Sequence, residues 1–133
     1  MAAPSPSIAS LIVALGGGLG AAARYNVGRW VGHLTGVNAV FPWPTLTVNV
    51  VGSLVMGLLT GWLARHGDPG ETWRLLIGVG MLGGFTTFSS FSLEMALLVE
   101  RGLPAMAALY AGVSVLAGIA GLFLGLIVMR VAG

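Results

Sequence analysis

The sequence predicts an all-α membrane protein with four transmembrane helices, the third of which is broken near the midplane. Of its 133 residues, 56% are hydrophobic and 8% are charged, and the mean hydropathy is +0.96. A soluble domain carries about a quarter charged residues. The chain is too short for two domains, so we expect one transmembrane domain over residues 1–133.

The same composition excludes other classes of protein. The chain has no cysteine, which excludes disulfides and thiolate metal sites. A net charge of +2 is too small to indicate binding to nucleic acid. No nucleophile–base pair or metal-ligand cluster stands out, so we do not expect an enzyme. Residues 1–15 contain no Lys or Arg, so we expect the first apolar segment to be retained as a span rather than cleaved as a signal peptide.

Four apolar segments are long enough to cross the membrane, because about 20 residues of helix cover a ~30 Å hydrocarbon core. We expect them at roughly residues 8–31, 45–64, 73–99 and 104–128. The breaker cluster 41–44, the polar loop 65–71 and the turn 100–102 separate them. The tryptophans lie near the expected ends, as interfacial aromatic residues do: Trp30, Trp43, Trp62 and Trp73.

The arginines divide almost evenly between the two sides of the membrane. An excess of Lys and Arg on the cytoplasmic side normally sets the orientation of a membrane protein. One interpretation is a small protein with a weak orientation signal. The other is an antiparallel homodimer of oppositely inserted copies, whose two-fold axis lies in the membrane plane. One side would hold Arg65, Arg74 and Arg130, and the other Arg24, Arg29 and Arg101.

The third segment is interrupted by the sequence GGFTTFSSFS at residues 83–92. From Trp73 to Gly83 a helix rises ~15 Å, about half of the hydrocarbon core. We therefore expect the helix to break at Gly83 and Gly84 near the midplane, with freed carbonyls available to a cation and freed N–H groups to an anion. The alternative is a glycine kink that lets two helices cross closely.

Polar side chains follow one face of two other spans. Thr45, Asn49 and Ser53 recur at helical spacing in the second span, and Tyr110 and Ser114 do so in the fourth. Such residues either hydrogen-bond between helices or line a pathway, and both interpretations stay open.

Four further residues are candidates for function. Arg24 either extends to the interface or concentrates anions at a vestibule. Phe88 and Phe91 are neighbours on a helix, where packing is the usual role, although the positive edge of a phenyl ring can also hold a small anion. Glu94 is an acid inside a span, and such acids are functional candidates by default.

Three motifs in order resemble the Fluc fluoride channels, also called CrcB, over essentially the whole chain. They are GGLGAAARY at 17–25, TLTVNVVGS at 45–53 and GGFTTFSSF at 83–91. The resemblance implies an antiparallel, dual-topology homodimer in the cell membrane, with two pores that passively export cytoplasmic fluoride. It also implies a structural sodium ion at the dimer centre, held by the backbone carbonyls of Gly83 and Thr86.

The resemblance further implies which residues form the fluoride pathway. Phe88 and Phe91 match the phenylalanines that face the ion, and Asn49 matches the pore asparagine. Glu94 matches an acid near the pore, and Arg24 the family arginine. The implied polar lining residues are Ser89, Ser90, Tyr110 and Ser114.

Two other functions are compatible with a short four-span chain. A dual-topology, proton-coupled multidrug exporter needs an acid deep in its first span, and residues 8–31 contain none. A non-transporting subunit of a larger membrane complex would conduct no ions by itself. Fluoride flux through the isolated protein separates all three.

Overall fold

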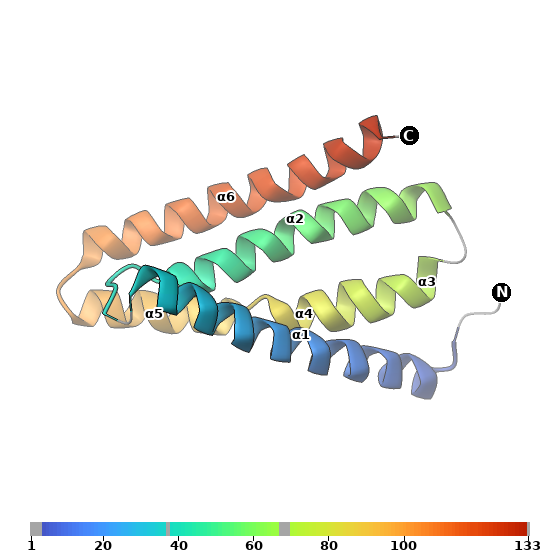
Figure 1. Ribbon diagram of the computed structural model, residues 1–133, viewed down its shortest axis with the longest axis horizontal. Coiled ribbons are helices and arrows are strands. Elements are labelled where there is room, and N and C mark those ends of the chain that lie inside the picture. Colours follow the sequence, from blue (N-terminus) through green and yellow to red (C-terminus); the bar gives the residue numbers. More distant parts are fainter. Residues whose placement is uncertain (1–3, 37, 67–69, 133) are drawn as a thin grey trace.

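The structure, a computed structural model, describes residues 4–36, 38–66 and 70–132, and over these ranges its regular elements are all helices (Figure 1). Four helical segments are long and apolar enough to cross a membrane, which confirms the predicted number of spans. Their elements are α1 (Pro6–Thr35), α2 (Trp43–His66), a third span made of α3 (Gly70–Trp73), η1 (Arg74–Leu82), α4 (Gly83–Phe85) and α5 (Phe88–Glu100), and α6 (Pro104–Val131).

Proline and glycine set three of the helix ends close to where the sequence placed them. Pro6 and Pro104 each open a helix, at a position where the missing N–H costs nothing. Gly36 ends α1 with a φ of 94°, a conformation that favours glycine. The ends of the helices lie a few residues outside the predicted spans. Residues 67–69 of the predicted polar loop lie outside the described residues.

The third span breaks three residues later than the sequence suggested. Gly83 and Gly84 are helical, and the extended backbone falls at Thr86 (φ −81°, ψ 157°) and Thr87 (φ −151°, ψ 116°). The segment before the break also differs from expectation. Residues 74–82 form the π-helix η1, so the predicted α-helical rise does not apply to them.

Gly84 of the third span serves close packing, whereas a Cβ atom on Gly83 would meet nothing within 4 Å. A Cβ atom on Gly84 would collide with the carbonyl oxygen of Gly17 in α1. On the facing helix, a Cβ on Gly20 would collide with the carbonyl oxygen of Met81. The two backbones therefore touch directly, as small residues permit in membrane helix pairs. This is the close-crossing alternative that the sequence left open.

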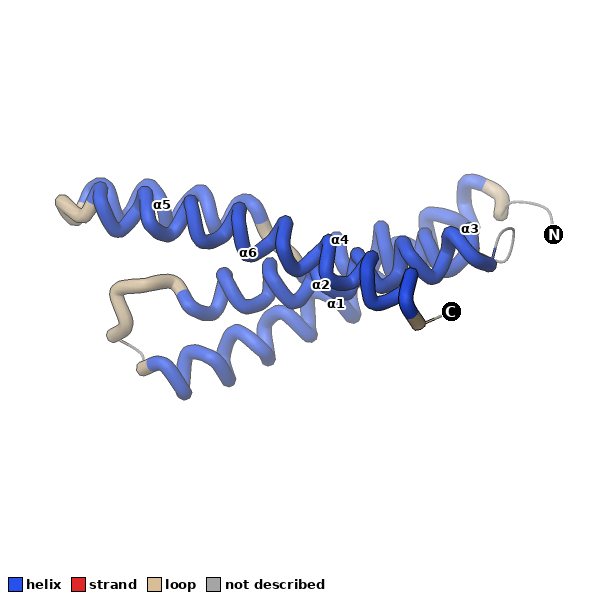
Figure 2. Tube along the Cα trace, turned by 90° about the horizontal axis from the view of Figure 1, so that it is seen from above, coloured by secondary structure: helices blue, strands red, loops and turns tan. Residues whose placement is uncertain are grey.

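The helices form a splayed bundle instead of a solid core. They cross near α4 and spread apart toward their ends, as the view from above shows (Figure 2). Helix α2 packs along α6, and α1 packs on η1 and α4. The buried hydrophobic cluster is small and contains Leu46, Leu98, Ala107 and Tyr110. Many large apolar side chains are exposed, which suits helices surrounded by lipid.

We predict that Gly20→Ala destabilises the protein by about 1–3 kcal/mol, because the new methyl group meets rigid backbone in α4 and η1. Gly18→Ala is the matched control on the same helix, since no atom lies within 4 Å of its Cβ position. Thermal unfolding in detergent should show a lower midpoint for Gly20→Ala alone. Equal midpoints for the two variants would contradict the packing described above.

Candidate functional site

The break in the third span is closed by one side chain from another helix. Asn49 of α2 donates from Nδ2 to the carbonyl oxygen of Thr87 at 3.1 Å, and its Oδ1 accepts from the Thr87 N–H at 2.8 Å. The N–H and the carbonyl of Thr87, whose backbone is extended, are thus both paired with the side-chain amide of Asn49. At membrane depth an unpaired peptide group costs several kcal/mol, so this pair makes the break tolerable.

The two threonines also cap the helices on either side of the break. Thr87 Oγ1 accepts from the N–H of Ser90 at 3.2 Å and so forms the N-cap of α5. Thr86 Oγ1 donates to the carbonyl oxygen of Leu82 at 2.8 Å. Local hydroxyl groups therefore satisfy part of the hydrogen bonding that the interruption removes. Ser89, next to the cap, is exposed.

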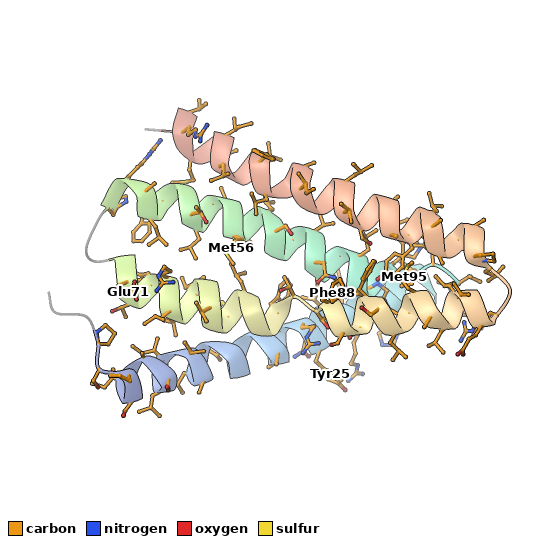
Figure 3. The ribbon with its side chains drawn as sticks, turned by 180° about the vertical axis from the view of Figure 1, so that it is seen from behind. Tyr25, Met56, Glu71, Phe88 and Met95 are labelled. Atoms are coloured by element: carbon orange, nitrogen blue, oxygen red, sulfur yellow. The ribbon has the colours of Figure 1, made fainter. Side chains whose placement is uncertain are left out.

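A hollow of about 330 Å³ lies beside the break, between α2 and the third span. Asn49, Gly83, Thr86 and Phe88 contribute to its wall. Met56 and Phe88 project into the space between α2 and the third span (Figure 3). Phe88 is a large apolar residue, yet it is 79% exposed beside the polar residues Thr86 and Thr87. The single chain thus leaves this hollow open.

Two phenyl rings connect the hollow to Glu94, whose side chain is partly buried. The Phe88 and Phe91 ring centroids are 5.7 Å apart, and the rings of Phe91 and Tyr110 are 5.1 Å apart. Tyr110 is fully buried, and its hydroxyl donates to Glu94 Oε2 at 2.7 Å. Thr45 donates to the other oxygen, Oε1, at 2.6 Å. Glu94 therefore ties α2, α5 and α6 together through two short hydrogen bonds.

A second hollow of about 280 Å³ lies between α1 and α2 on the other side of the break. Arg24, Thr45 and Ser90 line it, and Thr87 lines both hollows. Within the part of the chain that the structure describes, Arg24 makes no ion pair; the salt bridge found there joins Glu71 and Arg74 at 2.8 Å. A positive side chain thus faces the break from the side opposite Phe88.

The structure brings most of the predicted residues together, but not all at one place. Asn49, Phe88, Gly83 and Thr86 share the first hollow, while Arg24 and Ser90 share the second. Glu94 and Tyr110 form a separate cluster that Phe91 contacts. Ser114 lies outside these sets; its Oγ is buried and has no hydrogen-bond partner among the described residues.

Two important residues were not among the predicted site residues. Thr87 is the partner of Asn49 and the cap of α5, and Thr45 is a donor to Glu94. Both had a sequence signal. Thr45 lies one turn before Asn49 on the same helix face, and a threonine followed by a hydroxyl-rich turn is typical of a helix start.

These features define a multi-pass helical membrane protein with polar groups gathered at a break inside one span. The chain belongs to the CrcB family: the family model described as CrcB-like protein, Camphor Resistance (CrcB), matches residues 11–126. This confirms the resemblance found in the three motifs.

Curated relatives cover nearly the whole chain. A protein of Novosphingobium aromaticivorans is 62% identical over 122 residues, which are 92% of this chain and 96% of the relative. A protein of Erythrobacter litoralis is 54% identical over 129 residues, or 94% of each chain. One from Rhodospirillum centenum is 53% identical over 122 residues, or 92% of this chain and 95% of the relative. Each of the three is named fluoride-specific ion channel FluC.

We predict that Asn49→Leu destabilises the break, because it leaves the N–H and the carbonyl of Thr87 unpaired at a cost of about 1–3 kcal/mol. Hydrogen exchange at the Thr87 amide should become faster. Asn26→Leu is the control, since the exposed Asn26 side chain bonds only to the carbonyl of Ala22 in its own helix. An unchanged exchange rate at Thr87 in Asn49→Leu would show that the pair does not close the break.

Proposed function

We propose that this protein is a fluoride-selective ion channel that lets cytoplasmic fluoride leave the cell passively across the cell membrane. The observation that carries the proposal is the break itself. An amide, several hydroxyl groups and the exposed Phe88 ring surround an interruption inside a membrane span. The shared family and the names of the relatives support fluoride as the ion.

The chemistry around the break suits a small anion. Fluoride holds its hydration water strongly, so a selective path has to replace that water with many donors in a narrow space. Hydroxyl groups, an amide and phenyl edges can supply such donors without a cationic side chain that would hold the ion too tightly. Ser114 offers a buried hydroxyl that has no hydrogen-bond partner among the described residues. Arg24, on the far side of the break, raises the local anion concentration.

We also propose that the working unit is an antiparallel homodimer with two pores. A single copy leaves the hollow beside the break open and Phe88 79% exposed. The described arginines support insertion in both directions: Arg65 and Arg130 lie in the last turns of α2 and α6, whereas Arg29 and Arg101 lie at the opposite end of the bundle. A second copy of opposite orientation would cover the hollow and complete its walls.

A sodium ion at the dimer centre fits the residues present. Gly83 and Thr86 both line the first hollow, and a Cβ on Gly83 would meet nothing within 4 Å, so the peptide groups there can be approached closely. Neutral carbonyl oxygens are suitable ligands for a hard monovalent cation. Gly83 and Thr86 of both copies would hold the ion, which would neutralise carbonyl dipoles that otherwise meet at the symmetry axis.

The multidrug exporter remains the weaker alternative. No acid lies within the described helix α1, where proton-coupled exchange would need one, and the comparisons lend it no support. Glu94, the acid inside a span, is already paired with two hydroxyl groups.

We predict that proteoliposomes holding only this protein release fluoride rapidly without a pH gradient and release chloride at least about 100-fold more slowly, a difference of ~2.7 kcal/mol in barrier height. A fluoride electrode and a chloride electrode measure the two rates after a potassium ionophore is added. Empty liposomes are the control. Equal rates for both halides, or release that requires a proton gradient, would refute the proposal.

We predict that Phe88→Ile and Phe91→Ile each slow fluoride release at least about fivefold, the rate equivalent of ~1 kcal/mol for a lost ring-edge contact. Phe123→Ile is the control, because Phe123 is an exposed ring on α6 outside the described hollows. Size-exclusion chromatography should give the same elution volume for all three variants. Wild-type rates in both Phe88→Ile and Phe91→Ile would show that the two rings only pack and do not contact the ion.

A further inference from the structure

A third hollow, of about 200 Å³, lies at the end of the bundle where α5 turns into α6. The loop residues Ala39, Val40 and Pro42 line one side of it. The other side includes Glu94 of α5 and Arg101, which follows the last residue of that helix. The hollow therefore lies at one end of the bundle and extends along α5 to the partly buried carboxylate of Glu94.

This hollow is linked to the break by a continuous series of contacts. Phe88 borders the first hollow, its ring faces Phe91 at 5.7 Å, and the ring of Phe91 faces Tyr110 at 5.1 Å. Tyr110 then donates to Glu94, which borders the third hollow. The same line of side chains thus runs from the middle of the membrane to its surface.

Glu94 creates an electrostatic problem for an anion on this line. Glu94 accepts two short hydrogen bonds, and in its ionised form this carboxylate repels an approaching anion. Arg101 carries the opposite charge at the outer rim of the same hollow and makes no ion pair with any described residue. Glu100, its exposed neighbour in sequence, does not line the hollow. Arg101 is therefore the basic residue that lines this hollow, and Glu94 is the acidic one.

We propose that Arg101 gathers anions at this mouth of the pathway and offsets the repulsion of Glu94, which rests on the proposed channel function. Its role is to raise the anion concentration at the rim, not to bind the ion in the narrow part of the path. A unit charge roughly 7 Å from an anion in water changes the local anion concentration about threefold. The effect must vanish at high ionic strength, where the screening length falls from ~30 Å at 0.01 M to ~3 Å at 1 M.

The test measures initial fluoride release from proteoliposomes at low fluoride concentration, with an impermeant organic salt at ~10 mM or at ~1 M. Arg101→Gln should release fluoride about threefold more slowly than wild type at the low ionic strength and at the wild-type rate at the high one. Arg101→Lys should match wild type at both. Arg29→Gln is the matched control, because Arg29 lies toward the same end of the molecule, on α1, but outside the hollow.

Three results would overturn the inference. They are a wild-type rate for Arg101→Gln at low ionic strength, a loss that persists unchanged at ~1 M salt, and an equal loss in Arg29→Gln. The persistent loss would show a structural role, and the equal loss would show a general surface-charge effect. Wild-type protein that releases no fluoride at all would instead refute the channel function itself, so the two failures can be told apart.

Discussion

The structure depends on the pairing of Asn49 with both peptide groups of Thr87. A broken helix inside a membrane exposes N–H and carbonyl groups where no lipid atom can bind them. One amide side chain resolves this for Thr87, which is buried, and the threonine hydroxyls cap the two helix ends. Once these groups are satisfied, the remaining polar atoms of the region are free to face a hollow, which an unbroken helix would not allow.

A second polar cluster, formed by Glu94, Thr45 and Tyr110, joins three helices by hydrogen bonds. Glu94 has no basic partner within 4 Å among the described residues, yet it lies between three helices. Thr45 and Tyr110 direct their hydroxyl hydrogens to it, so those two donors are not available to a passing anion in this arrangement. The sequence grouped Tyr110 with the lining residues, and this stays a prediction; in the structure Tyr110 is fully buried and donates to Glu94. It positions the carboxylate and supports Phe91 through ring contact.

Most of the architecture could be predicted from the sequence, because apolar length and proline or glycine punctuation determine membrane spans almost alone. The location of the break could not. Gly83 and Gly84 favour both a broken helix and a close helix crossing, and the approach of α1 to Gly84 is visible only in three dimensions. The hydrogen-bond partners of Glu94 could not be predicted either, since Thr45 lies 49 residues away and Tyr110 lies 16 residues away in the chain. Composition predicts which polar residues lie at membrane depth, but three-dimensional packing decides which of them remain unpaired.

The two faces of the third span differ in how completely the chain covers them. Toward α1 the face is closed, since backbone meets backbone at Gly20 and Gly84 and no further element can enter. Toward α2 it is open, with a hollow of about 330 Å³ beside Thr86 and an exposed phenyl ring at its edge. Lipid tails could fill this hollow but offer no hydrogen bonds to the polar residues that line it, Asn49, Ser53, Thr86 and Thr87. A second copy related by a two-fold axis could supply both apolar surface and polar partners, so the asymmetry between the faces favours assembly through the open one.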